Sequence, residues 1–140
     1  MKTIIYLSVL FLMISFVAQA QNERKYIREG NRYYDKAMAD TTKVDTTMYS
    51  QAETAYRKAL DKKPDDLKWD FNLGDALYKQ KKFEESAAKF GQIADKNTDK
   101  VEKSRAIYNM GNSLLMQNKL DESIEAYKDA LRKNPKDLEA

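Results

Sequence analysis

Two stretches of this chain repeat each other without a gap, and this repetition restricts the possible folds more than any other feature. Residues 69–93 align with residues 106–130, and seven of the 25 aligned positions are identical. Self-similarity at a period of a few dozen residues is typical of solenoids, in which each repeat stacks on its neighbours. Solenoids present long surfaces to solvent, so the repetition predicts a binding scaffold.

Within the repeats, small and aromatic residues recur at fixed offsets along segments with helical periodicity. Leu73 and Leu77 are four residues apart, as are Tyr56 and Leu60, which indicates amphipathic helices. Small residues let two helix axes approach closely, and a large aromatic side chain fills the gap beside them. A generic helical bundle would share the apolar periodicity but not the matched offsets, so we expect an array of paired helices.

The pattern resembles the tetratricopeptide repeat (TPR), a unit of about 34 residues with two antiparallel helices, A and B. The resemblance implies that a glycine of helix A lies where the helices cross and meets a small–aromatic–small set of helix B. The fold implied is an all-α solenoid of about three helix-turn-helix repeats. The matching sets are Gly30 with Ala52, Tyr56 and Ala59; Gly74 with Ser86, Phe90 and Ile93; and Gly111 with Ser123, Tyr127 and Ala130.

The repeat boundaries follow from proline positions and from the diverged first unit. Pro64 and Pro135 end two units, because proline lacks an amide hydrogen and restricts the residue before it. The first unit contains an inserted polar loop at residues 40–47 between its two helices. The expected units are residues 21–66, 67–100 and 101–137.

Two departures from a regular array stand out. Gly74 and Gly111 are 37 residues apart, which implies a small insertion around residues 97–100. Residues 138–140 look like the start of a further helix A, and terminal units of such arrays need a polar cap. We therefore expect the 140 residues to be a fragment of a longer protein.

Residues 1–20 have the pattern of a cleaved signal peptide. Met1 and Lys2 form a short positive start, residues 3–17 are apolar, and Ala18-Gln19-Ala20 has the small-x-small form of a signal-peptidase site. The alternative is an uncleaved membrane anchor, but the apolar run is shorter than the roughly 20 residues that span a bilayer. We expect export to the periplasm, with any membrane association indirect.

Composition argues against an enzyme and against a nucleic-acid-binding protein. The chain has no His and no Cys, which excludes the usual nucleophile systems and zinc ligand sets, and only four glycines, with no phosphate-binding loop. The net charge is only +3, without a basic stripe of interleaved aromatics. We expect no cofactor and no metal. Helix pairs such as Glu53/Arg57 and Glu85/Lys89 are interpreted as solvated faces.

The family resemblance also implies where a partner would bind. TPR ligands, usually extended peptides or partner helices, lie in a concave groove lined by helix A. Counting from each glycine gives apolar, amide and charged positions that fit a peptide. For Phe71 and Tyr108, packing between helices is an equal alternative. The groove residues are Ile27, Asn31, Tyr34, Lys68, Phe71, Asn72, Asp75, Tyr78, Lys79, Arg105, Tyr108, Asn109, Asn112 and Met116, with Arg24, Arg28, Asp35 and Leu115 at further matching positions.

One TPR subfamily grips the terminal carboxylate of cytosolic chaperones with a Lys/Asn clamp. Asn31, Asn72 and Arg105 match clamp positions, but Ile27 and Asn109 replace the basic residues expected at the other two. Export would also remove that partner. The sequence therefore argues against a carboxylate clamp.

The loop DTTKVDTT, residues 40–47, has two interpretations. Asp and Thr side chains favour turns, which makes a polar connector the simpler one. Asp40-Thr41-Thr42 and Asp45-Thr46-Thr47 also match the O-glycosylation sequon of Bacteroidota. The second interpretation predicts sugars on Thr41 and Thr46, which the intact mass of the mature protein would reveal.

Among TPR proteins, the layout most resembles those of the Bacteroides aerotolerance (Bat) cluster. The resemblance covers residues 21–140 and implies an envelope adaptor for membrane proteins with von Willebrand A domains. Two alternatives remain: a subunit of outer-membrane protein assembly, and a module that binds a small ligand or a peptidoglycan fragment.

Overall fold

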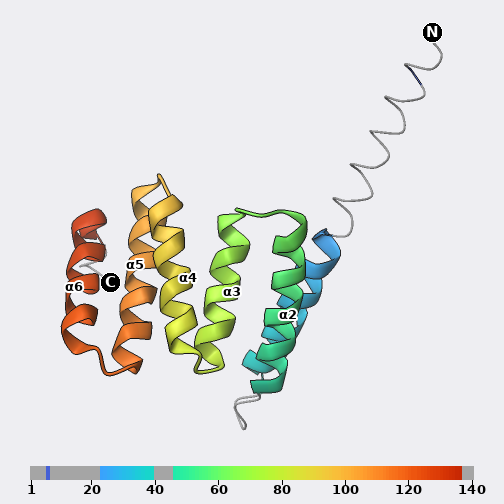
Figure 1. Ribbon diagram of the computed structural model, residues 1–140, viewed down its shortest axis with the longest axis horizontal. Coiled ribbons are helices and arrows are strands. Elements are labelled where there is room, and N and C mark those ends of the chain that lie inside the picture. The colour runs from blue at the N-terminus through green and yellow to red at the C-terminus, as the bar shows by residue number, and fades with distance from the viewer. Residues whose placement is uncertain (1–5, 7–22, 40–45, 137–140) are drawn as a thin grey trace.

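A computed structural model of the protein describes residue 6 and residues 23–39 and 46–136. The predicted signal peptide, apart from Tyr6, lies outside these residues, as do Thr41 and residues 138–140. The described chain forms a row of helices and contains no strand (Figure 1). This confirms the all-α solenoid.

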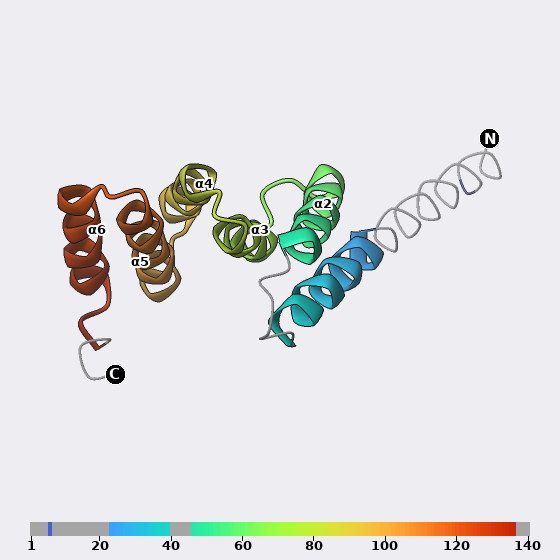
Figure 2. The ribbon, with the colours of Figure 1, turned by 90° about the horizontal axis from the view of Figure 1, so that it is seen from below.

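Within residues 23–39 and 46–136, six α-helical segments alternate between two layers. The first spans residues 23–39 and is followed by α2 (Thr46–Lys62), α3 (Leu67–Lys79), α4 (Phe83–Lys96), α5 (Lys100–Met116) and α6 (Leu120–Lys133). From α2 onward, each helix packs against the next one in the chain. In Figure 2, helix 23–39 and α3 lie on one side of the row, and α2 and α4 on the other. We call helix 23–39, α3 and α5 the A helices, and α2, α4 and α6 the B helices.

Local sequence signals set the helix ends. Asp66 caps α3 by accepting from the Trp69 amide, and Asp99 caps α5 by accepting from the amides of Val101 and Glu102. A capping carboxylate satisfies backbone amides that have no partner within the helix. Lys81 and Asn118 hold matching positions in the two A-to-B turns, and each has a positive φ, of 63° and 62°. The same turn geometry therefore recurs in two units.

The extra length between the second and third units is helical. Leu67 lies seven residues before Gly74, whereas Lys100 lies eleven residues before Gly111. The insertion expected around residues 97–100 thus adds about one turn to the start of α5.

Each unit has the predicted contact between a glycine and an aromatic ring. A Cβ added at Gly30 would lie 2.6 Å from the Tyr56 ring, and one at Gly74 would lie 2.8 Å from the Phe90 ring. The same holds for Gly111 and the ring of Tyr127, at 2.8 Å. Any larger residue would force the two helices of that unit apart, because packed interiors leave no room for a methyl group.

Buried hydroxyls support the same crossings in the second and third units. Ser86 Oγ donates to the Gly74 carbonyl and Ser123 Oγ to the Gly111 carbonyl, each at 3.0 Å. Ala52 takes this position in the first unit and is fully buried. The core around these crossings forms two clusters, one centred on Tyr56 and Leu77 and the other on Phe90 and Ile107.

The interpretation of Glu53 as part of a solvated face is wrong. Its carboxylate is buried, with the whole residue 8% exposed, and it accepts from Arg57, Gln80 and Lys82 at 2.8–2.9 Å. Lys89 does not pair with Glu85 but binds the buried Asp70 at 2.9 Å. The Glu53 network joins the first unit to the turn after α3 of the second, whereas the Asp70–Lys89 pair joins the two helices of the second unit. Helical spacing alone does not show either contact.

None of the helices within residues 23–39 and 46–136 combines the length and the apolar character needed to cross a bilayer. Among the same residues, no three or more Asp or Glu side chains cluster as a metal ion would require.

Candidate partner-binding surface

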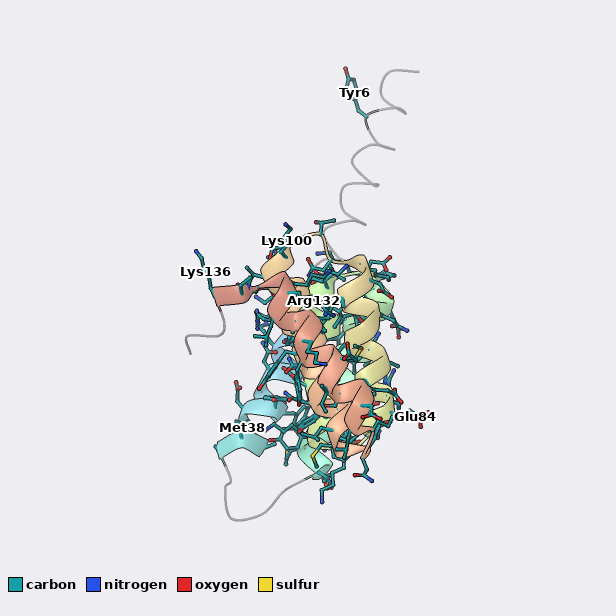
Figure 3. The ribbon with its side chains drawn as sticks, turned by 90° about the vertical axis from the view of Figure 1, so that its left-hand side faces the viewer. Tyr6, Met38, Glu84, Lys100, Arg132 and Lys136 are labelled. Atoms are coloured by element: carbon teal, nitrogen blue, oxygen red, sulfur yellow. The ribbon has the colours of Figure 1, made fainter. Side chains whose placement is uncertain are left out.

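All fourteen predicted groove residues lie on the three A helices, so the structure brings them onto one layer of the solenoid. We call this layer the A-helix face. Met38 of helix 23–39 and Glu84 of α4 lie on opposite sides in Figure 3, which separates the A-helix face from the B-helix side. The fourteen side chains differ in how much of their surface and hydrogen-bonding capacity is already used by neighbouring residues.

Basic side chains mark the starts of α3 and α5. Lys68 and Arg105 hold matching positions, six residues before Gly74 and Gly111, and both are exposed. Arg105 donates to both carboxylate oxygens of Glu102, at 2.8 and 2.9 Å. Its guanidinium therefore has a fixed position at the edge of the face. Glu102 was not among the predicted residues, although its position three residues before Arg105 was a usable signal.

Phe71 and Tyr108, for which the sequence left packing and partner binding as equal alternatives, have different surroundings. Phe71 packs edge-on against Phe90, with ring centroids 5.1 Å apart, and the Arg105 guanidinium lies 5.0 Å from the Phe71 ring. Tyr108, at the matching position of the third unit, is 54% exposed and contacts Tyr127 on one side only. Phe71 is thus a packing residue, whereas most of the Tyr108 ring is not covered by the described residues.

The amides form hydrogen-bonded groups with tyrosine hydroxyls. Asn31 Oδ1 accepts from Tyr56 Oη at 2.9 Å and from Asn72 Nδ2 at 3.4 Å. Asn112 Oδ1 accepts from Tyr127 Oη at 2.8 Å. Sequence reasoning assigned both tyrosines to gap filling and missed that their hydroxyls reach the A-helix face and fix the amides there.

In the third unit, Asn112 also donates weakly to Asn109. Its Nδ2 lies 3.5 Å from Asn109 Oδ1. Among the described residues, the Asn109 side-chain NH₂ group has no hydrogen-bond acceptor. That group can therefore donate to a main-chain carbonyl of a bound peptide.

Two half-buried tyrosines border the middle of the face. Tyr34 packs edge-on against Tyr49, and Tyr78 packs edge-on against Phe83, each pair with centroids 5.3 Å apart. Burial, reinforced by the nearby charge of Asp75, raises the pKa of the Tyr34 phenol well above its usual range. Both rings are anchored by B-helix residues, so they form fixed walls.

Asp75, on α3, lies close enough to Tyr34 for its charge to act on the Tyr34 phenol. Burial raises the pKa of its carboxyl to about 6, although the positive charges of Lys79 and Arg105 pull it downward. A carboxylate that loses part of its hydration without gaining a hydrogen-bond donor behaves in this way.

Two hollows on this layer occupy matching places in the second and third units. The first, of about 480 Å³, includes Phe71 and Ile93 and is bordered by Glu102 and Arg105 of α5. The second, of about 440 Å³, includes Tyr108 and Ala130, and the described residues that line it belong to α5 and α6. An exposed apolar group lies on the third unit as well, with Met116 52% and Leu115 45% exposed. The third unit thus offers the most accessible apolar area of the face.

The two predicted glycosylation residues are separated by a boundary of the described chain. Thr46 is the first residue of α2 and is exposed, so the helix takes over the last two residues of the expected loop 40–47. Glycosylation of Thr46 and Thr41 stays a prediction.

Comparisons with known proteins agree with this architecture. Two family models described as tetratricopeptide repeat match residues 43–100 and residues 104–137. No curated protein sequence matches the chain significantly.

Solved structures with the same fold include domains that cover most of this chain. The N-terminal domain of stress-induced protein-1 (STI-1) from C. elegans matches with a TM-score of 0.68 and 18% identity, covering 84% of this chain and 87% of that one. The first TPR of Spaghetti (RPAP3), bound to the HSP90 peptide SRMEEVD, matches with a TM-score of 0.65 and 21% identity, covering 83% and 82%. A MamA RS-1 ArsTM double mutant matches with a TM-score of 0.56 and 16% identity, covering 81% and 76%.

Proposed function

The chain belongs to the tetratricopeptide repeat family, and we propose that it is a non-enzymatic scaffold that binds a peptide segment of another protein along its A-helix face. TPR domains bind protein peptides, and one structural neighbour holds a peptide of HSP90. The segment bound here differs in chemistry, because Ile27 and Asn109 replace two basic positions of the carboxylate clamp.

The exposed ring of Tyr108 is the observation that supports this proposal most strongly. Its counterpart Phe71 is covered by Arg105 of the following unit, whereas Tyr108, among the described residues, is 54% exposed beside an apolar hollow and the Asn109 amide donors. Large aromatic side chains at the centre of an interface contribute much of its binding energy. Nearby amides then fix an extended main chain through hydrogen bonds.

We further propose that the scaffold works in the cell envelope as a Bat-type adaptor. Support comes from the signal-peptide pattern of residues 1–20 and from the resemblance to TPR proteins of the aerotolerance cluster. The partners are then envelope membrane proteins that carry von Willebrand A domains.

In-cell cross-linking of the tagged full chain, followed by mass spectrometry of captured proteins, tests both levels of the proposal. The variant with Tyr108→Ala and Met116→Ala removes exposed apolar area, and the matched control with Gln92→Ala and Asp95→Ala changes exposed B-helix residues of α4. We expect the wild type and the control to capture the same partner and the first variant to lose it.

The identity of the captured protein then decides the role. Proteins with von Willebrand A domains support the adaptor, and β-barrel assembly components replace it with a role in outer-membrane protein assembly. Equal capture by the wild type and the Tyr108/Met116 variant would contradict binding on the A-helix face. No capture above background would contradict the scaffold and direct attention to a small ligand of the apolar hollow.

A further inference from the structure

One position of helix A differs in the second unit from its counterparts in the first and third. The residue after the crossover glycine is Asn31 in the first unit and Asn112 in the third, and Asp75 in the second. In the first and third units, the aromatic residue of helix B is a tyrosine whose hydroxyl donates to that asparagine, at 2.9 and 2.8 Å.

The second unit lacks this hydrogen bond at both ends. Phe90 takes the place of the tyrosine and has no hydroxyl, while Asp75 offers two oxygen acceptors where the other units have an amide. Asp75 makes neither a hydrogen bond nor a salt bridge with any residue that the structure describes. A half-buried carboxylate without a donor is costly to the folded state unless another group satisfies it.

The charged neighbours of Asp75 leave it only partly compensated. Lys79, one turn later on α3, and Arg105, on α5, lower the pKa of the carboxyl, but neither lies within ion-pair distance. The Arg105 guanidinium is already bound to Glu102. Helix 23–39 contributes Tyr34 and Asp35 and α2 contributes Tyr56; the phenols of Tyr34 and Tyr56 have pKa values raised by burial and, in part, by the charge of Asp75.

We propose that Asp75 is the point on the A-helix face that binds a positively charged group of the partner segment, namely a lysine or arginine side chain. This inference rests on the proposed function, because it names the chemistry of a partner bound to the same face. The walls formed by Tyr34 and Tyr78 accept the aliphatic stem of such a side chain, and the carboxylate accepts its terminal N–H groups. Lys79 is the internal competitor for the carboxylate.

Binding through Asp75 depends on pH. Because the carboxyl has a pKa of about 6 in the free protein, lowering the pH from about 7.5 to about 5 protonates it and removes its attraction for a cation. Partner affinity therefore falls with acidification, in a range where ordinary aspartates keep their charge.

Selection from a phage-displayed library of random 12-residue peptides tests the inference directly. The bait is the full chain at pH 7.5, with Asp75→Asn as the variant and Asp61→Asn, an exposed aspartate of the B helix α2, as the control. We expect peptides selected on the wild type and on the control to share a lysine or arginine at one position. Peptides selected on Asp75→Asn should lack that preference.

Fluorescence anisotropy of one selected peptide then measures the effect. Replacing its basic residue with norleucine should weaken binding to the wild type at least tenfold and leave binding to Asp75→Asn nearly unchanged. Acidification to pH 5 should weaken binding of the original peptide to a similar extent. Lys79→Ala should strengthen binding severalfold, because the competing cation is removed.

The outcomes separate this inference from the proposed function. Peptides that bind at Tyr108 but show no basic preference, or that bind Asp75→Asn as tightly as the wild type, overturn the role of Asp75 alone. Failure to select any peptide whose binding depends on Tyr108 overturns the proposed function together with this inference.

Discussion

Glu53 and Asp75 are carboxylates of two consecutive helices, yet their surroundings are opposite. Glu53, on α2, is buried and accepts hydrogen bonds from Arg57, Gln80 and Lys82. Burial alone would raise the pKa of Glu53, but these donors outweigh it and leave the pKa below its usual value. Asp75, on α3, has no such donors, and its pKa is raised to about 6.

The difference shows that burial by itself does not decide what a carboxylate does. Donors within the fold turn Glu53 into a link between the first and second units, because Gln80 and Lys82 belong to the turn after α3. The lack of donors leaves Asp75 available to a group from outside. The same chemical group therefore stabilises the fold at Glu53 and, under our proposal, recognises a partner at Asp75.

The junction between the second and third units shows that the Glu53 network is a local solution. At the positions matching Glu53, Arg57, Asp70 and Lys89, the later junction has Ala87, Gly91, Ile107 and Ala126. These small and apolar residues line a groove of about 710 Å³ between α4 and α6. Stacking of the units thus does not require ion pairs at these positions.

The largest effect is expected for removal of the Glu53 carboxylate. Glu53→Ala leaves the cations of Arg57 and Lys82 and the amide of Gln80 without their shared acceptor. Breaking a buried charge network costs about 3–5 kcal/mol, and the partial exposure of both cations reduces the expected loss here to about 2–3 kcal/mol. Urea unfolding at pH 7.5 measures this loss.

The control for that variant is Gln92→Ala, at an exposed position of α4. Changes at such positions usually stay within about 0.5 kcal/mol. If Glu53→Ala and Gln92→Ala destabilise the protein equally, the hydrogen bonds of Glu53 do not contribute to stability. The contrast between a stabilising Glu53 and an uncompensated Asp75 would then be wrong.

A smaller effect of opposite sign is expected for Asp75→Asn. The amide has no charge to desolvate, so the variant should be more stable than the wild type by about 1 kcal/mol at pH 7.5. The gain should shrink at pH 5, because the wild-type carboxyl is then protonated. Thermal unfolding at the two pH values measures it, and a destabilised variant at pH 7.5 would show that Asp75 has a donor within the fold.

The two carboxylates also predict opposite contributions to the pH dependence of stability. Glu53 has a lowered pKa in the folded state, so its contribution is present above its usual pKa of 4.5 and is lost as the pH falls further. Asp75 has a raised pKa, so the folded state gains stability as the pH falls through about 6. Unfolding free energies between pH 7.5 and 3.5 should therefore fall less steeply at the acid end in Glu53→Gln than in the wild type. An unchanged slope there would contradict the network.

The smallest effect is expected for Arg57→Ala. Arg57 joins Glu53 and Glu85 but is about half exposed, and exposed ion pairs contribute about 0.2–1 kcal/mol. The expected loss is about 0.5 kcal/mol, and it should shrink in the Glu53→Ala background, where the exposed Glu85 is the remaining acceptor of Arg57. A double-mutant cycle by urea unfolding tests this coupling.

The repeat architecture could be predicted because its signals are local. Gly74 with Phe90, and Gly111 with Tyr127, are each 16 residues apart, and the structure places both pairs in contact. Offsets of this kind survive any change in the surface residues, since close approach of two helices requires a residue without a side chain.

The burial of Glu53 could not be predicted in the same way. Its spacing from Arg57 is that of an ordinary solvated pair, and its other donors, Gln80 and Lys82, come from nearly thirty residues later. Likewise, Phe71 and Tyr108 hold the same position in their units. Arg105 of the following unit lies over Phe71, whereas Tyr108 is 54% exposed among the described residues.

The aligned repeats show that two residues of the second unit differ from their counterparts, but not that Asp75 lacks a hydrogen-bond donor. Asp75 and Phe90 depart together from the Asn–Tyr pairs of the other two units. The structure supplies the link between the two differences, because the tyrosine hydroxyl donates to the asparagine in the first and third units.

Site-specific photo-cross-linking tests the central claim, that partners bind the A-helix face, most directly. A photoreactive p-benzoylphenylalanine replaces Tyr108 on the A-helix face in one variant and Glu84 on the B-helix side in another, and each full chain is irradiated in its native cells. We predict that a partner is cross-linked from position 108 and not from position 84. Cross-linking of the same partner from position 84 alone would contradict the claim.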